Sequence, residues 1–503
     1  MPYVLGVDIG TQSTKALLID AGSGRIAAQH SHGYQPDTPR PLWAEQDAAV
    51  WLDAVVACIA GCMAQAERQA IPPGDVAALC VSSLYGGSGI PVDANMQPLH
   101  PCLIWMDRRA EDEVAWVRET IDQERLLDIT GNGVDSYYGY TKMLWLQRHR
   151  PEVWSRTRHL LPPNAYVAHA LTGALAVDHS SAGNIGGVYD MRARAWSDEM
   201  LRLLGIPPAM MPERLVEASA TVGTLRAEWA GRTGLIAGTP VIAGGVDAAV
   251  ATFAAGATRQ GQHVAMIGTS MCWGSIAQTA DARHGLISMP HVFNGLQDLY
   301  VFGGAITAGA SVSWFQEQLG AALPLSTLDG EALGIEAGSD GVVFLPYLMG
   351  ERSPVWDGRA SGAFVGLSLF HTRAHLYRAV LEGVTFALRH NIEAGRRNLQ
   401  ALDDTLIVVG GAAHSGLWMQ IAADITGYPV QTIEQNVEAP LGAALLAGLG
   451  VGLVTPEQAA GGWVTLIPRA QPNPAVKETY DRLFSVYTDL YPALKDTLHR
   501  LRG

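Results

Sequence analysis

The sequence predicts an α/β protein made of two similarly built lobes, and three observations support this fold class. Apolar runs of strand length alternate with helical patterns, which is typical of mixed sheets covered by helices. A strand, a turn of glycine and hydroxyl residues, and a second strand occur at 4–20, and the same pattern returns at 261–278. The chain has 503 residues, of which 48% are hydrophobic and 16% charged, enough for two large cores.

The first half begins with strands and continues with helices. Tight turns containing glycine separate three short apolar runs, so we expect an antiparallel meander followed later by a buried strand. The predicted strands are 4–7, 15–20, 25–30 and 76–82. Apolar residues at i+4 spacing predict one helix over 47–69, and an acidic first turn marks another over 107–122.

A strand over 240–243 runs into Gly244-Gly245 and Asp247, and a helix of small residues follows. We expect this helix to act as a hinge, so the predicted lobes are 1–253 and 254–503. The other elements expected in the second half are a strand–glycine–helix unit, a packed helix too short and glycine-rich for a membrane span, and an amphipathic terminal helix. They lie at 405–427, at 441–454 and from Asn473 onward.

Charge and cysteine content exclude several classes of function. The formal net charge is −14 and no run of Lys or Arg occurs, so we expect neither a nucleic-acid nor a membrane partner. The 5 cysteines are scattered and lack zinc-ligand spacing, which is typical of reduced thiols. The N-terminus has no signal-peptide pattern. These features favour a cytoplasmic protein.

The two glycine turns are candidate phosphate sites. Backbone N–H groups and hydroxyls at Gly10-Thr11-Gln12-Ser13 and at Gly268-Thr269-Ser270 could cradle an anion, with Lys15 as a nearby cation. The Walker P-loop and dinucleotide-binding motifs are both absent. The alternative is that both segments are ordinary hairpin turns, where glycine, serine and threonine are common.

Two carboxylates extend the hypothesis to phosphoryl transfer. Asp8 would repel phosphates unless Mg²⁺ lay between them, since Mg²⁺ prefers oxygen ligands. Asp247 could accept the proton of an attacking hydroxyl, or it could be a helix N-cap. Gly410-Gly411-Ala412 would let a flat ligand approach the backbone, although tight strand–helix packing explains it equally.

Longer segments resemble the FGGY family of carbohydrate kinases, and within it most closely the xylulose kinases. The segment GAFVGLSLFHTRAHLYRAVLE (362–382) resembles the family's C-terminal signature, and YYGYTKMLWLQRH (137–149) its N-terminal signature, with Gly139 as a departure. The segments 41–47 and 104–109 are similar as well. The resemblance implies two actin-like, ribonuclease H-like lobes, each with a central mixed sheet, flanking a deep catalytic cleft that takes ATP and Mg²⁺.

The same resemblance implies roles for individual residues. Asp247 would be the general base and would share the metal with Asp8. The residues expected to hold the nucleotide are Gly10, Thr11, Gln12, Ser13, Lys15, Gly268, Thr269, Ser270, Gly309, Ser313, Gly410, Gly411, Ala412 and Ser415. The residues expected around the substrate are Gly86, Gly87, Ser88, Trp105, Asp107, Arg109, Tyr137, Asp247 and Ala248.

The expected sugar pocket departs from the family pattern. Gly86-Gly87-Ser88 occupies the position of Met-His-Gly in xylulose kinases, and Ala248 follows the base where Asn or Gln is usual. Losing these polar groups weakens discrimination between hydroxyl patterns. Asp107 and Arg109 match a family motif near the pocket, and a structural salt bridge is the equal alternative.

The expected activity is ATP-dependent phosphorylation of a small sugar at a primary hydroxyl, with a ketopentose such as D-xylulose as substrate. The alternatives are another polyol or sugar acid (glycerol, erythritol or gluconate), or an actin-like ATP-binding regulator without kinase activity. A homodimer is a candidate assembly.

Overall fold

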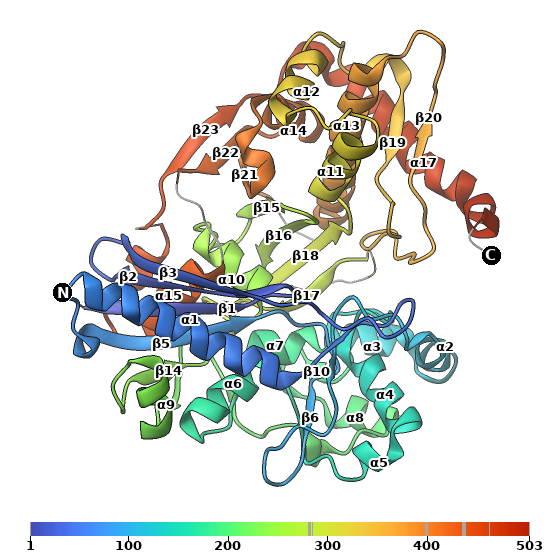
Figure 1. The fold of residues 1–503 in the computed structure, drawn as a ribbon. Coiled ribbons are helices and arrows are strands. Elements are labelled where there is room, and N and C mark those ends of the chain that lie inside the picture. Colours follow the sequence, from blue (N-terminus) through green and yellow to red (C-terminus); the bar gives the residue numbers. More distant parts are fainter. Residues whose placement is uncertain are drawn as a thin grey trace.

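Two β-sheets, one in each half of the chain, form the centre of the molecule (Figure 1). The computed structural model describes residues 2–279, 283, 285–397, 401–434, 439–461 and 463–501. Helices cover both sheets, and the two halves contact each other along the middle of the molecule. The predicted α/β class with two sheet-containing lobes is therefore confirmed.

The first sheet has six strands in the order β13-β14-β5-β1-β2-β3. Its strands are β1 (Tyr3–Ile9), β2 (Ser13–Asp20), β3 (Ile26–Gly33), β5 (Val76–Ser83), β13 (Thr221–Thr224) and β14 (Pro240–Ile242). β1, β2 and β3 form the expected antiparallel meander. β5 runs parallel to both β1 and β14, so the carboxyl ends of these three strands meet at one edge.

The second sheet has seven strands in the order β17-β18-β16-β15-β21-β22-β23. Its strands are β15 (His263–Ile267), β16 (Met271–Ala277), β17 (Ile287–Pro290), β18 (Leu299–Ala305), β21 (Leu406–Val409), β22 (Val430–Ile433) and β23 (Leu466–Ala470). β15 pairs antiparallel with β16 and parallel with β21. This repeats the relation of β1 to β2 and β5, so the repeated hairpin predicted from the sequence is present.

Five short strand pairs lie outside the two large sheets. They are β4 (Glu45–Gln46) with β7 (Cys102–Leu103), β6 (Ile90–Val92) with β8 (His159–Leu161), β9 (Val177–Asp178) with β12 (Leu215–Val216), β10 (Tyr189–Asp190) with β11 (Ala195–Trp196), and β19 (Val343–Leu345) with β20 (Ala363–Val365). Each is too short for a periodicity that could be recognised in the sequence.

The longer helices pack through apolar faces against the sheets or against one another. They are α1 (Ala48–Arg68), α2 (Glu111–Thr120), α4 (Gly139–His149), α6 (Pro163–Thr172), α10 (Asp247–Ala254), α11 (Gly309–Gln318), α12 (Leu325–Ala332), α13 (Arg373–Arg396), α14 (Gly416–Thr426), α15 (Ala439–Gly450) and α17 (Lys477–Leu501). By length and composition α1 alone, within the described ranges, could cross a membrane. It contacts β2 and β3 along a buried face, and we interpret it as a core helix.

Helix α15 belongs to the second half of the chain but packs against β1, β5 and α10 of the first half. A side chain at Gly6 would start 2.0 Å from the carbonyl oxygen of Pro440. A side chain at Gly442 would start 2.2 Å from that of Val250. Glycine is therefore needed where α15 crosses, and the two halves share this contact. The boundary near residue 253 stays a prediction.

Candidate active site

Three parallel strands bring the two predicted carboxylates to one edge of the first sheet. Asp8, near the end of β1, accepts a hydrogen bond of 2.7 Å from the hydroxyl of Ser82 on β5. The next residue on β5, Ser83, pairs in parallel with Val246. Asp247 follows directly and begins α10. Positions that are 239 residues apart in sequence, 8 and 247, therefore meet because their strands end side by side.

Glycine is required where the chain enters Asp247. Gly244 has φ +71°, and a side chain there would start 1.9 Å from the carbonyl oxygen of Val81. A side chain at Gly245 would start 2.7 Å from the hydroxyl of Ser180. The Gly-Gly pair thus lets β14 end tightly against β5 and aims α10 at the sheet edge.

The Asp247 carboxyl has unusual electrostatics. Burial and the neighbouring Asp8 raise its pKa from 3.8 to about 7, against the lowering effects of the Ala248 N–H and of Arg352. The Ala248 N–H donates to Asp247 Oδ1 over 2.6 Å. The N-cap of α10 is Val246, and no side chain caps this helix, so the N-cap interpretation of Asp247 is wrong. A carboxyl that exchanges its proton near neutral pH suits a general base.

The second half of the chain reaches the same carboxyl. Cys272 lies on β16, two residues after the Gly268–Ser270 turn, and burial together with the charge of Asp247 raises its thiol pKa to about 11, while Arg352 lowers it. Tyr137 is buried too: its pKa rises to about 12, and it responds to both Arg352 and Asp247. The turn of the second hairpin and the expected sugar pocket therefore converge on Asp247.

Hydrogen bonds close the first hairpin turn and connect it to Trp105, one of the residues expected around the substrate. The Gly10 N–H donates to the Ser13 carbonyl over 3.0 Å, and the Tyr34 hydroxyl donates to the Gly10 carbonyl over 2.8 Å. The indole N–H of Trp105 donates to the hydroxyl of Thr11 over 3.0 Å. This bond links the phosphate-binding candidate to a predicted substrate residue. Lys15 faces Asp8 across the β1–β2 ladder, and the backbone of Gln12 accepts from the Tyr34 N–H.

A cavity of about 820 Å³ lies in the second half and is lined by most of the residues expected there for the nucleotide. Those lining it are Gly268, Thr269, Gly309, Ser313, Gly411, Ala412 and Ser415. Ser270 and Gly410 do not line it. Gly410 has φ +92°, and a side chain there would start 2.6 Å from the Ile267 carbonyl oxygen, so its glycine serves strand packing.

Further residues of this cavity were not predicted. Asp329 on α12 accepts a hydrogen bond of 2.7 Å from the Ser415 hydroxyl and another of 2.8 Å from Tyr377. Trp314 and Trp418 add indole rings to the wall. Apolar rings with a few fixed polar groups are typical of sites for a base and ribose. No local motif marks these residues, because the fold collects them from separate helices.

Helix α11 begins directly against the second hairpin turn. The Gly309 N–H donates to the Gly268 carbonyl over 2.9 Å, and the Ala310 N–H donates to Thr269 over 3.0 Å. A side chain at Gly309 would start 2.5 Å from the Gly268 carbonyl oxygen. Only glycine allows this approach, and Ser313 follows one turn later on the cavity wall.

Of the Gly86–Ser88 segment, only Gly86 lies against the aromatic residues. It has φ +88°, and a side chain there would start 3.0 Å from Tyr137 Cζ and 3.1 Å from Trp105 Cβ. A side chain at Gly87 would instead start 2.6 Å from the Leu103 carbonyl oxygen. Ser88 is fully buried, and its hydroxyl accepts from the Leu103 N–H over 3.1 Å. We therefore assign Gly87 and Ser88 to backbone packing.

Lys142 belongs to the segment that resembles the N-terminal signature, and it fixes the backbone around Gly86 and Tyr137. Its ammonium donates to the carbonyls of Gly86, Ser136 and Tyr137 over 2.9, 2.5 and 2.7 Å. Burial lowers its pKa to about 7. Three acceptors match the three N–H donors of an ammonium group, so we interpret Lys142 as charged.

Asp107 and Arg109 form a closed structural network. Asp107 accepts from the Ala44 N–H over 2.6 Å and from Arg109 Nε over 2.8 Å. Arg109 also donates to Glu45 over 2.7 Å and lies over the Trp43 ring at 3.7 Å. Neither side chain makes a hydrogen bond or ion pair with Asp247 or Tyr137. The salt-bridge alternative therefore describes both residues. The side chain of Ala248 is only a methyl group, so this residue offers Asp247 its backbone N–H and no side-chain hydrogen bond.

The candidate ligands for the predicted Mg²⁺ are two carboxylates. Within the described ranges no group of three or more His, Cys, Asp or Glu side chains could hold an ion. Asp8 and Asp247 supply two oxygen donors, which fits Mg²⁺ because this ion is usually held by one or two carboxylates plus phosphate oxygens and water. Mg²⁺ at these residues stays a prediction.

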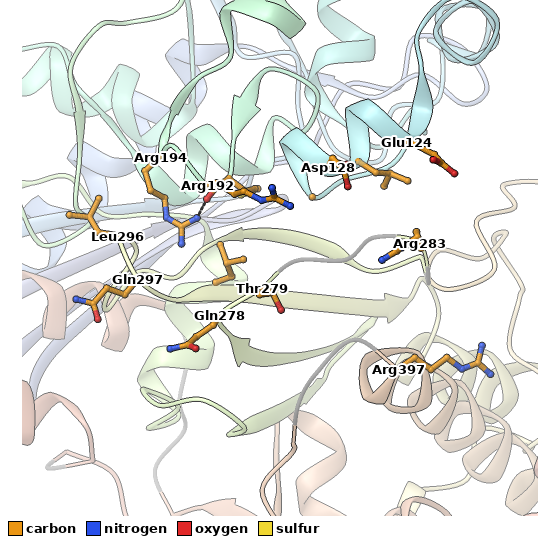
Figure 2. A pocket seen from close by; sticks show the side chains of 14 residues that line it. Glu124, Asp128, Arg192, Arg194, Gln278, Thr279, Arg283, Leu296, Gln297 and Arg397 are labelled. Carbon is orange, nitrogen blue, oxygen red and sulfur yellow. Dashed lines mark hydrogen bonds between the residues drawn. The ribbon is translucent and has the colours of Figure 1, made fainter.

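A second cavity, of about 700 Å³, lies between segments of the two halves (Figure 2). Its charged lining residues are four arginines and two acidic residues: Arg192, Arg194, Arg283, Arg397, Glu124 and Asp128. Arg194 donates to the Met191 carbonyl. None of the residues predicted for the active site lines this cavity, so the two sites are separate.

Comparison with known proteins identifies the family. The N-terminal domain of the FGGY family of carbohydrate kinases matches residues 3–254, and its C-terminal domain matches residues 263–451. The chain belongs to the FGGY family of carbohydrate kinases. It is therefore an ATP-dependent sugar kinase.

Relatives of this FGGY kinase align along its whole length. The xylulose kinase of Lactococcus lactis is 31% identical over 508 aligned positions, covering 100% of this chain and 99% of the relative. The ligand-bound xylulose kinase structure from Lactobacillus acidophilus has a TM-score of 0.92 at 26% identity and covers 100% of both chains. The gluconate kinase structure from the same organism also has a TM-score of 0.92 at 26% identity, covering 99% of each chain.

Sequence reasoning missed the segment of this FGGY kinase that reaches the cleft from the second half. Trp356 stacks on Tyr138 with ring centroids 6.1 Å apart and meets Tyr137 edge-on at 6.0 Å. Arg352 lies 5.9 Å above the Trp105 ring. One signal was present: Glu351-Arg352 is a charged pair inside an otherwise apolar stretch.

Proposed function

We propose that this FGGY kinase transfers the γ-phosphoryl group of ATP to a primary hydroxyl of a ketopentose such as D-xylulose, with Mg²⁺ held by Asp8 and Asp247. One observation carries the proposal. Asp8 and Asp247 lie at the same edge of the first sheet: Ser82 donates to Asp8, and the next residue, Ser83, pairs with Val246, directly before Asp247.

The residues have separate tasks in this reaction. Asp247 accepts a hydrogen bond from the substrate hydroxyl and takes its proton as the oxygen attacks phosphorus. Backbone N–H groups of the turns at 10–13 and 268–270 bind phosphate oxygens. Mg²⁺, when bound, neutralises charge on the phosphates. Closing the two halves excludes water, so ATP is used for transfer rather than hydrolysis.

A neutral ketose fits the substrate side better than a sugar acid. Full-length similarity to xylulose kinases supports a ketopentose. The equal structural likeness to a gluconate kinase keeps a sugar acid as the second candidate. A carboxylate would need a cation beside the Gly86–Ser88 segment, and the one lysine that contacts it, Lys142, already donates to three carbonyls.

A panel of sugars tests the proposal. ADP release would be measured with ketopentoses, alditols and aldonates, and the phosphorylated carbon would be assigned by phosphorus NMR. We expect the highest kcat/KM with a ketopentose and a phosphate on its primary carbon. A preference for an aldonate would overturn the substrate. ATP binding without transfer to any member would instead favour the regulator.

A further inference from the structure

Arg352 is a buried cation without a partner. Its residue is 8% exposed, and its Nε is buried with no hydrogen-bond partner. Across the described residues, no carboxylate oxygen lies within ion-pair distance of this guanidinium, and none accepts a hydrogen bond from it. Buried charges in proteins are normally paired, so an unpaired guanidinium beside Trp105 indicates a ligand.

The neighbouring carboxyls do not neutralise Arg352. Glu351 accepts from the Ile306 N–H over 3.1 Å and from the backbone N–H of Arg352 itself over 2.7 Å, and its second oxygen is buried without a partner. Asp247 senses the charge of Arg352, but its carboxylate accepts a hydrogen bond from the Ala248 N–H and forms no ion pair with the guanidinium. The guanidinium therefore retains its full capacity to donate.

The fold holds Arg352 in place from the second half. Asp357, six residues after Glu351, exchanges two backbone hydrogen bonds with it, over 2.9 and 3.0 Å. The Asp357 carboxylate accepts a hydrogen bond of 2.6 Å from Tyr491 on the terminal helix α17. A side chain at Gly304 would start 2.6 Å from Arg352 Nη2, so glycine on β18 leaves room for the guanidinium. The charge is thus anchored to one half and aimed at Trp105 and Asp247 of the other.

We propose that Arg352 is a catalytic residue that binds the phosphoryl group while it passes from ATP to the sugar. The role rests on the proposed function. The sugar oxygen forms a bond to the γ-phosphorus as the bond from phosphorus to the bridging oxygen of ADP breaks. Asp247 takes the hydroxyl proton, and ADP leaves with the electron pair. Arg352 donates hydrogen bonds to the phosphoryl oxygens and transfers no proton.

The position of Arg352 favours a phosphoryl group over a substrate carboxylate. Its charge acts on Asp247, the base at the attacking hydroxyl, and it lies over Trp105, which is hydrogen-bonded to Thr11 of the first phosphate turn. Under the proposed function, Asp247 and Thr11 both lie where the phosphoryl group is transferred. Guanidinium groups suit this site because their fork matches phosphate oxygens.

The test compares Arg352→Gln and Arg352→Lys with the wild type. The control is Arg359→Gln, an exposed arginine on the same segment that donates to the His499 carbonyl. Two affinities are measured by calorimetry: that for ADP alone, and that for ADP with aluminium fluoride, Mg²⁺ and the preferred sugar, which mimics the group in transfer. The kcat of each variant is measured alongside.

We expect Arg352→Gln to lose about 10³-fold in kcat and at least about 100-fold in affinity for the aluminium fluoride complex, with ADP affinity within about twofold of wild type. Arg352→Lys should recover part of both, and Arg359→Gln should match wild type. Retained ADP affinity also shows that the variant is folded.

Three outcomes would overturn the role. Wild-type affinity of Arg352→Gln for the aluminium fluoride complex would refute it while leaving the kinase function intact. A defect confined to aldonate binding, with normal transfer to neutral sugars, would assign Arg352 to a substrate carboxylate. A wild type inactive with every sugar would refute the proposed function, and this role with it.

Discussion

At the scale of single residues, the role proposed for Asp247 as general base has a cost in stability. Its carboxyl lies beside Asp8 in a partly buried position, and both conditions raise its pKa. The folded protein therefore binds the Asp247 proton more tightly than the unfolded chain does. Stability falls as pH rises from about 4, the unfolded pKa, through about 7, the folded one.

Asp247→Asn should remove this loss of stability and also most of the phosphoryl-transfer activity. Without ligands, we expect the variant to be more stable than wild type above pH 7 by about 2 kcal/mol, roughly half of what a three-unit shift gives, because cleft solvent screens the charge. The difference should shrink towards pH 4, while kcat falls about 10³-fold. Urea unfolding at pH 8 and pH 5 measures the first effect. Equal stability at both pH values would contradict the buried carboxylate pair.

Lys142→Met should damage the sugar side without touching the nucleotide. Three carbonyls would lose a charged donor, so we expect the free energy of unfolding to fall by about 3 kcal/mol and the KM for sugar to rise at least about tenfold. The KM for ATP should stay unchanged. Fluorescence-monitored unfolding and steady-state kinetics check this, and an unchanged sugar KM in a folded variant would argue against the supporting role.

Only some single-residue roles could be predicted from the sequence. Asp8 and Asp247 could be singled out, because each is a lone carboxylate beside glycine, and the structure brings both to one sheet edge; their roles stay predictions. The sequence left a salt bridge between Asp107 and Arg109 open as an alternative. Its other members, Ala44 and Glu45, could not be predicted, because they come from a distant segment. The role proposed for Arg352 could not be predicted either, because it depends on which residues of the first half lie beside this side chain.

At the scale of elements, we propose that the two hairpin turns and helix α11 bind the nucleotide. The strands and turns were predictable from apolar runs and glycine positions, and so were the core helix α1 and the packed, glycine-rich helix α15, which is observed at Ala439–Gly450 instead of 441–454. The helix predicted at 107–122 is observed only as Glu111–Thr120, since Asp107 is engaged in the salt bridge. Helix α11 was missed because its partner, the 268–270 turn, is non-local.

Gly309→Ala tests the contact between α11 and the second hairpin. The added methyl would overlap the Gly268 carbonyl oxygen, so the helix must move away from the turn. We expect the KM for ATP to rise about tenfold with the sugar KM unchanged. Gly330→Ala on α12 is the matched control, because a side chain there meets nothing within 4 Å. Equal kinetics in the two variants would exclude this contact from nucleotide binding.

At the scale of the whole molecule, α10 and α15 join the halves, while Arg352 and Cys272 bring the second half to Asp247. The family signatures pointed to two lobes, but the way α15 packs on the sheet of the first half depends on contacts between residues more than 400 positions apart, such as Gly6 with Pro440. No local pattern encodes such a contact.

Gly442→Ala should weaken the packing of α15 against the first half of the chain. A methyl group at the α10–α15 crossing would meet the Val250 carbonyl oxygen, and we expect a loss of about 2 kcal/mol in unfolding free energy with weaker binding of both nucleotide and sugar. Gly231→Ala on α9 (Ala227–Thr233) has open space around it and serves as the control. Thermal unfolding and ligand titration measure these effects. If Gly442→Ala lost affinity for one ligand only, α15 would not couple the halves.

The central claim is that one nucleotide and one sugar meet at Asp8 and Asp247. A crystal structure with a ketopentose, Mg²⁺, ADP and aluminium fluoride tests it most directly. The account predicts the acceptor hydroxyl within hydrogen-bond distance of Asp247, and the fluoride group between the turns at 10–13 and 268–270. A nucleotide bound elsewhere, for instance in the arginine-lined cavity, or a sugar with no hydroxyl at Asp247, would contradict it.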